Sequence, residues 1–401
     1  MENIENTPPQ QSSSGAGKWV VGIIIIALIV WGVIAKNKTS GPAMNDAGKS
    51  QVAGQTIKIG VSMPMTGDAA VYGEPAIKVI SMAIEEINNA GGINGQKLEM
   101  VLEDDKCNGK DATSAAQKLI NVDKVNIIIG SLCSSASLAE VPIAESNKVL
   151  MLSPGSTNPK LTGMSPYFFR IIPSDASQGS LDAEVSYKKG FRTVAFLVEN
   201  KDYPLGIYDA FEKRFSELGG KTLKETFEPD SKDFRTQLTK LRAQKPDVLF
   251  IDPQAPASAE TAIKQLSDLG WKPQIYLNEA TVGDVDFLKK NAATIEGALA
   301  AEFYVDTTNA KSKLLTENYK NKYKTDLTFL SYSHTEYDAV YLIAEGIKAV
   351  GNDGTKMASW SRTIKDWPGA SGKITVKSDG DRESGYSPEI VKDGKMEPYT
   401  E

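Results

Sequence analysis

The chain has 401 residues, with 45 basic and 51 acidic side chains and a net charge of −6. This length supports two or three domains, and the slight acidic excess argues against a nucleic-acid binder, which usually gathers a basic excess on one face. Its 41% hydrophobic and 8% aromatic content is typical of a globular protein. One histidine and two cysteines leave few ligands for a transition metal, so we expect neither a metal site nor a cofactor.

The N-terminal part of the chain differs from the rest. Residues 1–17 are polar and rich in proline, serine and glycine, which predicts a disordered tail. The charge-free run WVVGIIIIALIVWGVIA follows between Lys18 and Lys36, and as a helix it would span roughly 25 Å, near the lower limit for crossing a bilayer. We therefore predict a transmembrane anchor over 18–35 and a flexible tether over 36–55.

Two fates are open for this apolar segment. Val33, Ile34 and Ala35 resemble a small-residue cleavage site, which would make the segment a signal peptide. An uncleaved anchor is favoured because the preceding region is long and carries two glutamates. Lysines are more frequent after the segment than before it, and the positive-inside rule taken alone would place the folded body in the cytoplasm.

From Thr56 onward, short apolar runs alternate with amphipathic stretches. Ile77, Ile80, Ile84 and Ile87 recur at steps of three and four, the spacing of one helix face. The predicted strands are 57–63, 97–104, 126–131, 149–153, 168–172, 193–199, 247–252 and 274–279, and the predicted helices between them are 74–89, 112–121, 177–189, 205–218, 234–243 and 257–269.

This alternation of strand and helix predicts the fold class. Nearly continuous apolar strands are typical of parallel sheets covered by helices on both faces. The strand–helix units are too many for one sheet of ordinary width, so we predict an α/β protein with two doubly wound lobes. A TIM barrel is the competing arrangement, and the C-terminal third argues against it, because the predicted helices 311–324, 333–350 and 356–366 follow one another before two short strands.

Hydroxyl groups follow two neighbouring strands of the first lobe, where open parallel sheets bind their ligands. After NIIIG, Ser134 and Ser135 open a helix whose free N–H groups suit an anion such as a carboxylate. Plain N-capping by a single serine is the alternative. After VLMLS, Ser156 and Thr157 stand at an adjacent strand end, which favours convergence on one ligand.

The second lobe offers the opposite charge. Glu279 directly follows the apolar strand QIYLN and would hang into the crevice, with a solvated loop glutamate as the alternative. Tyr72 and Tyr203 occupy loop positions where they would wall the site, although each alone is also explained as a surface aromatic. Hydroxyl and N–H groups for a carboxylate, with a carboxylate for an ammonium group, are the minimum chemistry for holding an α-amino acid.

The sequence offers no reactive constellation. It lacks the glycine patterns of dinucleotide and phosphate loops, the G-x-S-x-G elbow and the H-E-x-x-H motif. His334 is the only histidine, and we interpret it as a solvated side chain. We therefore predict a protein that is not an enzyme.

Cys107 and Cys133 follow consecutive strands, at the same ends of neighbouring units. Such positions can meet the short Cα separation that a disulfide requires, with two free buried thiols as the alternative. A disulfide implies an oxidising compartment, so the body would lie on the extracytoplasmic side of the membrane. That inference outweighs the small difference in lysine count.

Several segments together resemble a known family. IGVSMPMTGDAAVYG, AIEEINNAGGINGQKLEMVLEDDKC, IIGSLCSSAS and LSPGSTNPKLT are similar to the leucine/isoleucine/valine-binding type of periplasmic binding protein, which has the type I fold and serves ABC importers. The resemblance runs from about Ile57 to Gly372 with the motifs in the same order. It implies two lobes joined by a three-strand hinge.

The resemblance also assigns roles to individual residues. It gives carboxylate binding to Ser134, a small-small-threonine turn to Gly155, Ser156 and Thr157, ammonium binding to Glu279, aromatic contacts to Tyr72, Tyr203 and Tyr337, and a disulfide to Cys107 and Cys133. Where the family often has two alanines before the threonine, this chain has Gly155 and Ser156, which makes the pocket floor slightly more polar.

The family's lobes exchange the chain three times, which the resemblance places near Ser174, Phe303 and Ala370. One lobe would then comprise 56–174 plus 303–370, and the other 175–302 plus 371–401.

The expected function is that of a monomeric, membrane-tethered receptor. It would capture an amino acid, branched-chain or similarly apolar, between two closing lobes and deliver it to an ABC transporter permease. The alternative is a sensory module of the same fold that signals through a partner protein.

Overall fold

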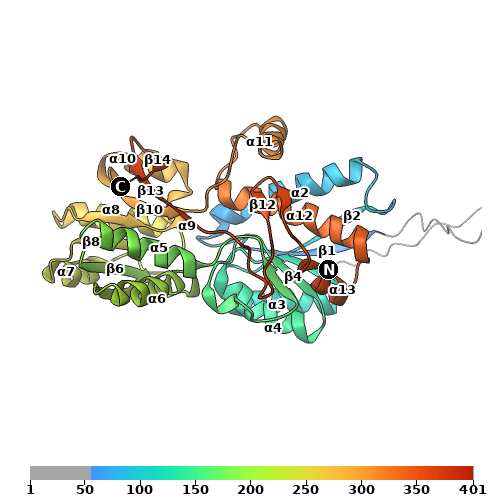
Figure 1. Cartoon of the computed structure of the whole chain (residues 1–401), viewed down its shortest axis with the longest axis horizontal. Coiled ribbons are helices and arrows are strands. Elements are labelled where there is room, and N and C mark those ends of the chain that lie inside the picture. Colours follow the sequence, from blue (N-terminus) through green and yellow to red (C-terminus); the bar gives the residue numbers. More distant parts are fainter. Residues whose placement is uncertain (1–55, 401) are drawn as a thin grey trace, which may run out of the picture. The chain divides into compact units, whose positions relative to one another are not determined.

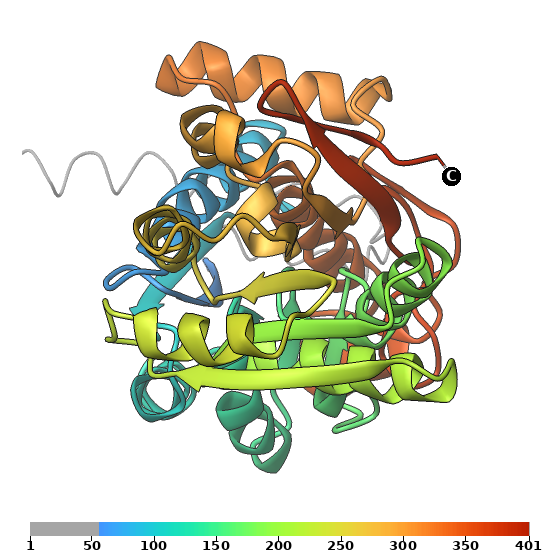
Figure 2. The ribbon, with the colours of Figure 1, turned by 90° about the vertical axis from the view of Figure 1, so that its left-hand side faces the viewer.

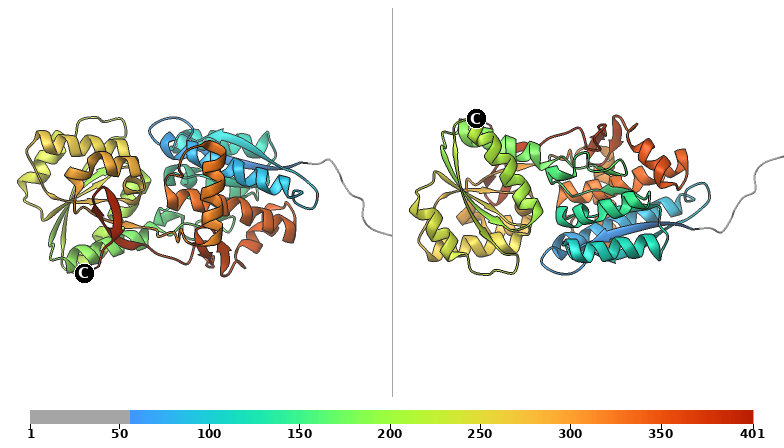
Figure 3. Two further views of the ribbon diagram at one scale, coloured as in Figure 1. Left: turned by 90° about the horizontal axis from the view of Figure 1, so that it is seen from above. Right: turned by 90° about the horizontal axis from the view of Figure 1, so that it is seen from below.

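The computed structural model describes residues 56–400, which fold into two lobes (Figure 1, Figure 3). The tail, anchor and tether expected at the N-terminus lie outside the described residues. Within residues 56–400, no helix has the length and apolar character needed to cross a bilayer.

The first lobe is built on a parallel sheet of five strands in the order β2-β1-β3-β4-β5. The helices α2 and α12 pack against each other, as do α3 and α4. The strands are β1 (Ile57–Met63), β2 (Leu98–Asp104), β3 (Ile127–Gly130), β4 (Leu150–Ser153) and β5 (Phe168–Arg170). The helices are α2 (Ala70–Asn89), α3 (Gly109–Asn121), α4 (Ser134–Ser146), α12 (Leu330–Val350), α13 (Gly354–Ser361) and the 3-10 turn η2 (Pro159–Leu161).

Alternation along β3 explains why this sheet is covered on both faces. Ile127 and Ile129 belong to the apolar core that includes α2 and α12, whereas Ile128 packs with Leu119 of α3 and Val141 of α4. Because both faces of β3 are buried, its residues are apolar without interruption, as the sequence shows.

The second lobe has a seven-stranded sheet in the order β14-β13-β10-β9-β8-β6-β7 (Figure 2). The strands from β6 to β10 run parallel, and β13 and β14 add antiparallel at one edge. The strands are β6 (Thr193–Glu199), β7 (Lys221–Phe227), β8 (Val248–Asp252), β9 (Gln274–Leu277), β10 (Leu299–Glu302), β13 (Ser387–Lys392) and β14 (Lys395–Pro398). The helices are α5 (Asp175–Lys188), α6 (Asp202–Glu217), α7 (Arg235–Ala243), α8 (Pro256–Asp268), α9 (Glu279–Val282) and α10 (Val285–Ile295).

The same alternation organises this sheet. Phe196 of β6 packs against Phe211 of α6 at a ring separation of 4.8 Å and stacks on Phe250 of β8 at 4.7 Å. Leu197, the next residue, belongs to a separate core that holds Leu238 of α7. The predicted α/β class with parallel sheets is therefore confirmed, and two open sheets exclude the barrel.

Four strands (β7, β10, β14 and the short strand Trp367–Gly369) and two helices (α9 and α10) were not predicted from the sequence. β7 is the edge strand of its sheet and buries few side chains, such as Leu223 and Phe227, so its apolar signal is weak. β10 is only four residues long and is rich in alanine. β9 ends at Leu277, earlier than predicted, because Asn278 accepts a hydrogen bond from the N–H of Thr281 and thereby caps α9.

The chain passes between the lobes three times. The first crossing lies between β5 and α5, and the second lies between β10 and α11 (Ala310–Tyr323). The third lies between β12 (Gly372–Ile374), which pairs with β11 (Trp367–Gly369), and β13.

The third crossing comes later in the chain than the predicted position near Ala370. Residues as far as Asp381 stay with the first lobe, because the buried guanidinium of Arg170 lies 2.7 Å from the Asp381 carboxylate. Val376 also forms an isolated bridge with Arg382. The boundary at 370–371 is therefore corrected to the segment just after Arg382.

Arg382 holds the crossing segments together. Its guanidinium donates to the carbonyl of Ile171 at 2.8 Å and to the carbonyls of Ser371 and Lys373 at 3.0 and 2.9 Å. It also lies over the ring of Phe303 at 4.7 Å. Because Ile171, Phe303 and Arg382 belong to the three different crossings, one side chain ties the three crossing segments together.

We expect Arg170→Met to lower the free energy of unfolding by about 3–5 kcal/mol, because Asp381 would be left buried and without its cation. Urea denaturation of the full chain measures this loss. Arg170→Met combined with Asp381→Asn should lose less than the single change, and Arg235→Met, which breaks the exposed pair with Asp233, should leave the midpoint nearly unchanged. Equal, small losses for both arginines would contradict the assignment.

Candidate functional site

A small cavity lies where the carboxyl ends of the two sheets face each other. Its volume is about 10 Å³, roughly the room that one water molecule needs. Side chains and backbone of both lobes line it, so any larger ligand must enter when the lobes are further apart. The lining residues are Tyr72, Leu132, Cys133, Gly155, Tyr203, Gln254, Ala280 and Tyr332.

Direct hydrogen bonds join the lobes at this cavity. The hydroxyl of Tyr72, on α2, lies 3.1 Å from the carbonyl oxygens of both Gln254 and Ala280 in the second lobe. The N–H of Ala280 in turn donates to the hydroxyl of Tyr203 at 3.3 Å. The predicted tyrosines Tyr72 and Tyr203 are thus both brought to one point, and both are buried.

The first lobe contributes hydroxyl groups and a helix N-terminus. Ser134 is the first residue of α4 and is buried, and its hydroxyl accepts a hydrogen bond from the N–H of Asn158 at 3.2 Å. The hydroxyl of Thr157 donates to the Asp175 carboxylate at 2.8 Å. The first N–H groups of α4 have no carbonyl partner within the helix, so this end of the cleft favours an anion.

Gly155 and Ser156, the two residues that differ from the family's usual alanines, form the turn that leads to Thr157. A Cβ at Gly155 would lie 2.6 Å from a methyl carbon of Leu132, so an alanine here would require the Leu132 side chain to shift. The hydroxyl of Ser156 donates to the carbonyl of Ser131 at 2.8 Å and lies 2.7 Å from the hydroxyl of Ser137. Ser156 therefore fixes the turn through its side chain.

The disulfide between Cys107 and Cys133 is confirmed. Their Cα atoms are 5.2 Å apart, and both side chains are buried. Cys133 is the residue that precedes α4, so the bridge attaches the start of that helix to the end of β2. It therefore restrains the helix N-terminus that faces the cavity.

Glu279 is the first residue of α9 and is fully buried, and neither of its carboxylate oxygens has a hydrogen-bond partner of good geometry among the described residues. Burial raises the pKa of Glu279 to about 7, although the nearby hydroxyls of Ser331 and Tyr386 and the N–H of Phe303 act in the opposite direction. A buried carboxylate without a partner is unfavourable, so this position favours a positively charged group.

Two further carboxyl groups accompany Glu279. Asp175 begins α5 and Asp252 ends β8, and each is fully buried with one oxygen that lacks a partner. Burial is the main cause that raises the pKa of both well above the usual range, and their mutual repulsion adds to it. Arg170 attracts Asp175 but is itself paired with Asp381. We refer to Asp175, Asp252 and Glu279 as the carboxyl cluster.

Of the predicted site residues, Tyr72, Gly155 and Tyr203 line the cavity. Ser134, Ser156, Thr157 and Glu279 are sequence neighbours of the lining residues Cys133, Gly155 and Ala280, whereas Tyr337 lies elsewhere. Its hydroxyl donates to Glu86 of α2 at 2.6 Å and lies beside Tyr341, so it faces the α2–α12 contact and does not line the cavity. The tyrosine that α12 does present to the cavity is Tyr332, whose ring lies 5.8 Å from the ring of Tyr72.

Sequence reasoning missed Tyr332, Asp175 and Asp252. Asp252 follows the apolar run VLFI, so the rule that selected Glu279, a carboxylate at a strand end, could also have found it. Asp175 sits at a helix start directly after the first crossing, where an acidic residue is also explained by the helix dipole. Tyr332 has no local signal, because it lies within a long helix that is buried on several sides.

His334, expected to be solvated, is buried. Its ring nitrogens lie 2.7 Å from the hydroxyl of Ser312 and 2.7 Å from the carbonyl of Leu330. Burial lowers the pKa of His334 to about 4, so the ring is neutral and joins α11 to α12. The tight apolar packing of α12 overrides the polar sequence around this residue.

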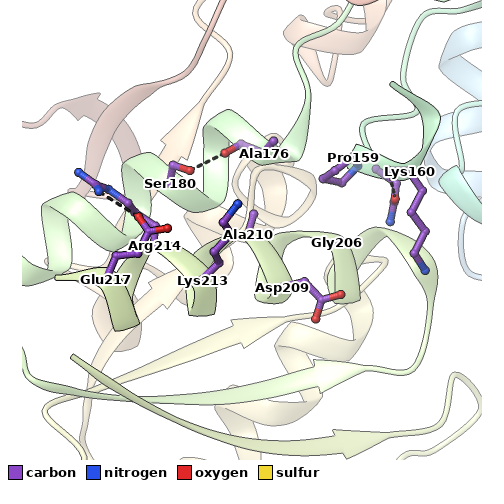
Figure 4. A pocket seen from close by; sticks show the side chains of 11 residues that line it. Pro159, Lys160, Ala176, Ser180, Gly206, Asp209, Ala210, Lys213, Arg214 and Glu217 are labelled. Atoms are coloured by element: carbon purple, nitrogen blue, oxygen red, sulfur yellow. Dashed lines mark hydrogen bonds and ion pairs between the residues drawn. The ribbon is translucent and has the colours of Figure 1, made fainter. Parts of the chain in front are cut away.

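A second hollow lies on the outer side of α5 and α6, with a volume of about 420 Å³ (Figure 4). It contains none of the predicted site residues. Arg214, which lines it, is already paired with Glu184 at 2.8 Å and with Glu217 at 3.1 Å. The charge of Arg214 is therefore satisfied, unlike those of the carboxyl cluster.

Two open α/β lobes, three crossings and a polar site buried between the lobes define a two-lobed solute-binding protein. The sequence pattern of the periplasmic binding protein family matches residues 56–386, and the chain belongs to that family. Its relatives are binding proteins, which confirms that the chain is not an enzyme.

Comparison with named relatives supports the same class. A leucine-, isoleucine-, valine-, threonine- and alanine-binding protein of Pseudomonas aeruginosa is 30% identical over 311 residues, 77% of this chain and 82% of that protein. The crystal structure of a leucine-binding protein from Thermotoga maritima has a TM-score of 0.79 at 30% identity and covers 86% of this chain and 98% of its own. A branched-chain amino acid transporter substrate-binding protein of Streptococcus pneumoniae, in complex with isoleucine, has a TM-score of 0.75 at 27% identity over 86% and 98% of the chains. The predicted resemblance to the leucine/isoleucine/valine-binding type is confirmed.

The raised pKa of Glu279 predicts a pH dependence of stability. Between its ordinary value of 4.5 and about 7, the folded state binds more protons at this site than the unfolded chain does. The free energy of unfolding should therefore fall as pH rises through this window, by about 3 kcal/mol from Glu279 alone. Glu279→Gln should remove that part of the fall.

Urea denaturation of both proteins between pH 4.5 and 8 checks this prediction. Burial also raises the pKa of Asp105 to about 6 and that of Asp182 to about 8, so the difference between the variant and the parent isolates Glu279. A difference that stays constant with pH would contradict the burial of an unpaired carboxyl at this site.

Proposed function

We propose that the chain is an extracytoplasmic receptor that captures an α-amino acid between its lobes for an ABC importer. The observation that carries this proposal is Glu279, a fully buried carboxyl group with no cation and no hydrogen-bond partner of good geometry among the described residues, in the lobe opposite the N-terminus of α4. An ammonium group would supply the missing partner, and a carboxylate would suit the N–H and hydroxyl groups of Ser134 and Thr157.

The carboxyl cluster helps to decide the charge of the ligand. An organic anion without an ammonium group would bring a further negative charge close to Glu279, Asp175 and Asp252, and the residues that line the cavity include no lysine or arginine to balance it. An α-amino acid carries both charges. Its carboxylate would bind at the N-terminus of α4, and its ammonium group would bind at Glu279.

An apolar side chain fits the remaining wall. Leu132 and the rings of Tyr72 and Tyr332 line the cavity, and Phe329 lies 4.8 Å from the Tyr72 ring, edge to face. Such a wall favours leucine, isoleucine or valine over polar amino acids. The named binding of branched-chain amino acids by the relatives supports this choice.

The lobes would close because the ligand binds the closed arrangement of the lobes more tightly than the open one. The ligand would first meet Ser134 and Thr157 in the first lobe, and closure would then bring Glu279 and Tyr203 of the second lobe onto its ammonium end. The ligand stabilises the closed form only to the extent that it binds that form more tightly.

Replacing Glu279 with alanine should weaken amino-acid binding at least about tenfold, because the ligand's ammonium group would be buried without a partner. Isothermal titration calorimetry with leucine on the full chain measures the effect. Glu99→Ala, a change at an exposed position of β2, is the matched control and should bind as the parent does. Unchanged affinity in Glu279→Ala would exclude the amino-acid assignment.

We also propose that the segment 18–35 tethers the receptor to the membrane beside its permease. The charge-free run supports this proposal, as does the disulfide, which requires an oxidising compartment. The body would then lie on the extracytoplasmic side.

The full-length protein should stay in the membrane fraction after alkaline carbonate extraction. Ile25→Lys combined with Ile26→Lys should release it, because each charge at the centre of a span costs about 2.5–3.5 kcal/mol. N-terminal sequencing of the mature protein provides the decisive control. A mature chain that begins after Ala35 would show that the segment is a cleaved signal peptide.

A further inference from the structure

A further hollow, distinct from the one beside α5 and α6, lies beside the second crossing, and we name it the crossing groove. Its volume is about 530 Å³, within the range of small-molecule sites. Its walls come from α9, α10, β10, β13 and the β13–β14 turn of the second lobe, from the crossing itself, and from the start of α12 with the loop before it (Figure 1). It shares no lining residue with the small cavity between Tyr72 and Ala280.

Two carboxyl groups form the floor of the crossing groove. β10 and β13 are antiparallel, with Ala300 opposite Glu389 and Glu302 opposite Ser387. Glu302 and Glu389 are therefore diagonal neighbours on the same face of the sheet, within reach of each other's side chains. Both line the groove, Glu389 is only 7% exposed, and neither forms an ion pair with any described residue.

Because the two carboxyl groups lie side by side, Glu389 buried and Glu302 partly buried, ionising both without a cation is unfavourable. Burial and mutual repulsion raise the pKa of Glu302 well above its usual range, and burial raises that of Glu389. Both shifts favour a pair that keeps a proton until a cation takes its place.

A third polar group points to a ligand at the same place. Ser331 lines the groove, is 2% exposed, and its hydroxyl oxygen has no hydrogen-bond partner of good geometry among the described residues. Because its hydroxyl also lies near Glu279, Ser331 stands between the groove and the carboxyl cluster.

The upper walls of the groove are apolar and open. Val285, Tyr304 and Leu330 line it and are 41%, 61% and 37% exposed. The charges at its rim are partly neutralised, since Asp326 pairs with Lys320 at 2.7 Å and Lys289 with Asp286 at 3.9 Å. Lys395, the first residue of β14, is the remaining rim cation.

We propose that the crossing groove binds a small organic cation, a primary ammonium group with an apolar chain. The ammonium would lie between the carboxylates of Glu302 and Glu389 and donate its third hydrogen bond to the hydroxyl of Ser331. The chain would lie against Val285, Tyr304 and Leu330.

Binding exchanges a proton for the cation. The pair begins as one carboxyl and one carboxylate, releases its proton to the buffer, and ends as two carboxylates around the ammonium. The summed charge of the two carboxyl groups and their ligand stays at minus one throughout. The bound cation therefore adds no net positive charge to repel a second ammonium at Glu279.

The groove also couples to the arrangement of the lobes. Leu327 comes from the first lobe, and Leu288 and Met396 come from the second, so one ligand contacts both. An amine bound there stabilises the arrangement in which Tyr72 is bonded to Gln254 and Ala280. It should raise the affinity for the amino acid, and the amino acid should raise its affinity by the same factor. This coupling rests on the proposed function, whereas amine binding itself does not.

Calorimetric titration of n-pentylammonium chloride into full-length Glu279→Gln tests the groove separately from the carboxyl cluster. We expect one amine to bind and up to about one proton to be released, read from the change in apparent enthalpy between two buffers of different ionisation enthalpy. Adding Glu302→Gln should weaken binding at least about tenfold, and 1-pentanol should not bind measurably. Adding Glu99→Gln instead is the matched control and should change nothing.

Several outcomes would overturn the proposal. These are pentylammonium binding that survives both Glu302→Gln and Glu389→Gln, binding without proton release, and equal binding of 1-pentanol. If Glu302→Gln fails to fold, Ser331→Ala, which removes one hydrogen bond and no charge, takes its place and should weaken binding by a smaller factor.

The coupling is tested in the parent protein, by titrating leucine with and without saturating pentylammonium. A severalfold higher leucine affinity with the amine supports it, and an unchanged affinity overturns the coupling alone. Failure of leucine to bind under either condition would count against the proposed function and leave the result for the groove in place.

Discussion

The feature on which the rest of this protein depends is a set of buried carboxyl groups without cations. Glu279, Asp175 and Asp252 are fully buried, and each has at least one oxygen with no partner among the described residues. Such a site is unfavourable in isolation, and the fold keeps it because strand ends and helix starts fix the backbone at each position. The same cost gives the ligand its advantage, since a cation entering between the lobes satisfies groups that nothing else in the described residues does.

The two buried arginines make their closest contacts at the crossing segments and form no ion pair with the carboxyl cluster. Arg170 is paired with Asp381, and Arg382 donates to backbone carbonyls of two crossings and lies on Phe303 of the other. Both cations are thereby committed to the base of the hinge and are not free to neutralise the carboxyl cluster. The lobes can therefore move as bodies about a fixed base, with the electrostatic driving force left at the cleft.

The sequence predicted more of the fold than of the site. Apolar strands bounded by helices were correctly placed because burial on both faces leaves a continuous signal, whereas the edge strand β7 has almost none. Ser134, Tyr203 and Glu279 were found because each stands where a buried strand ends and the next helix begins. Tyr332 and the true position of Tyr337 depend on how α12 is rotated against α2, which no local pattern states. The third crossing was misplaced because Arg170 and Asp381 are far apart in the sequence.

That separation bears on how the chain folds. The bond between Arg170 and Asp381 spans 211 residues, and the whole second lobe up to β10 lies between them. The first lobe therefore cannot be completed until nearly all of the chain is available, and neither lobe exists as a continuous piece. Such long-range contacts slow folding, because the entropy of closing the intervening loop is lost before the contact forms. Late completion of the first lobe would leave its sheet edge at β5 exposed until residues near Asp381 arrive, so the last part of the chain acts as the final step of assembly for a lobe that begins near residue 56.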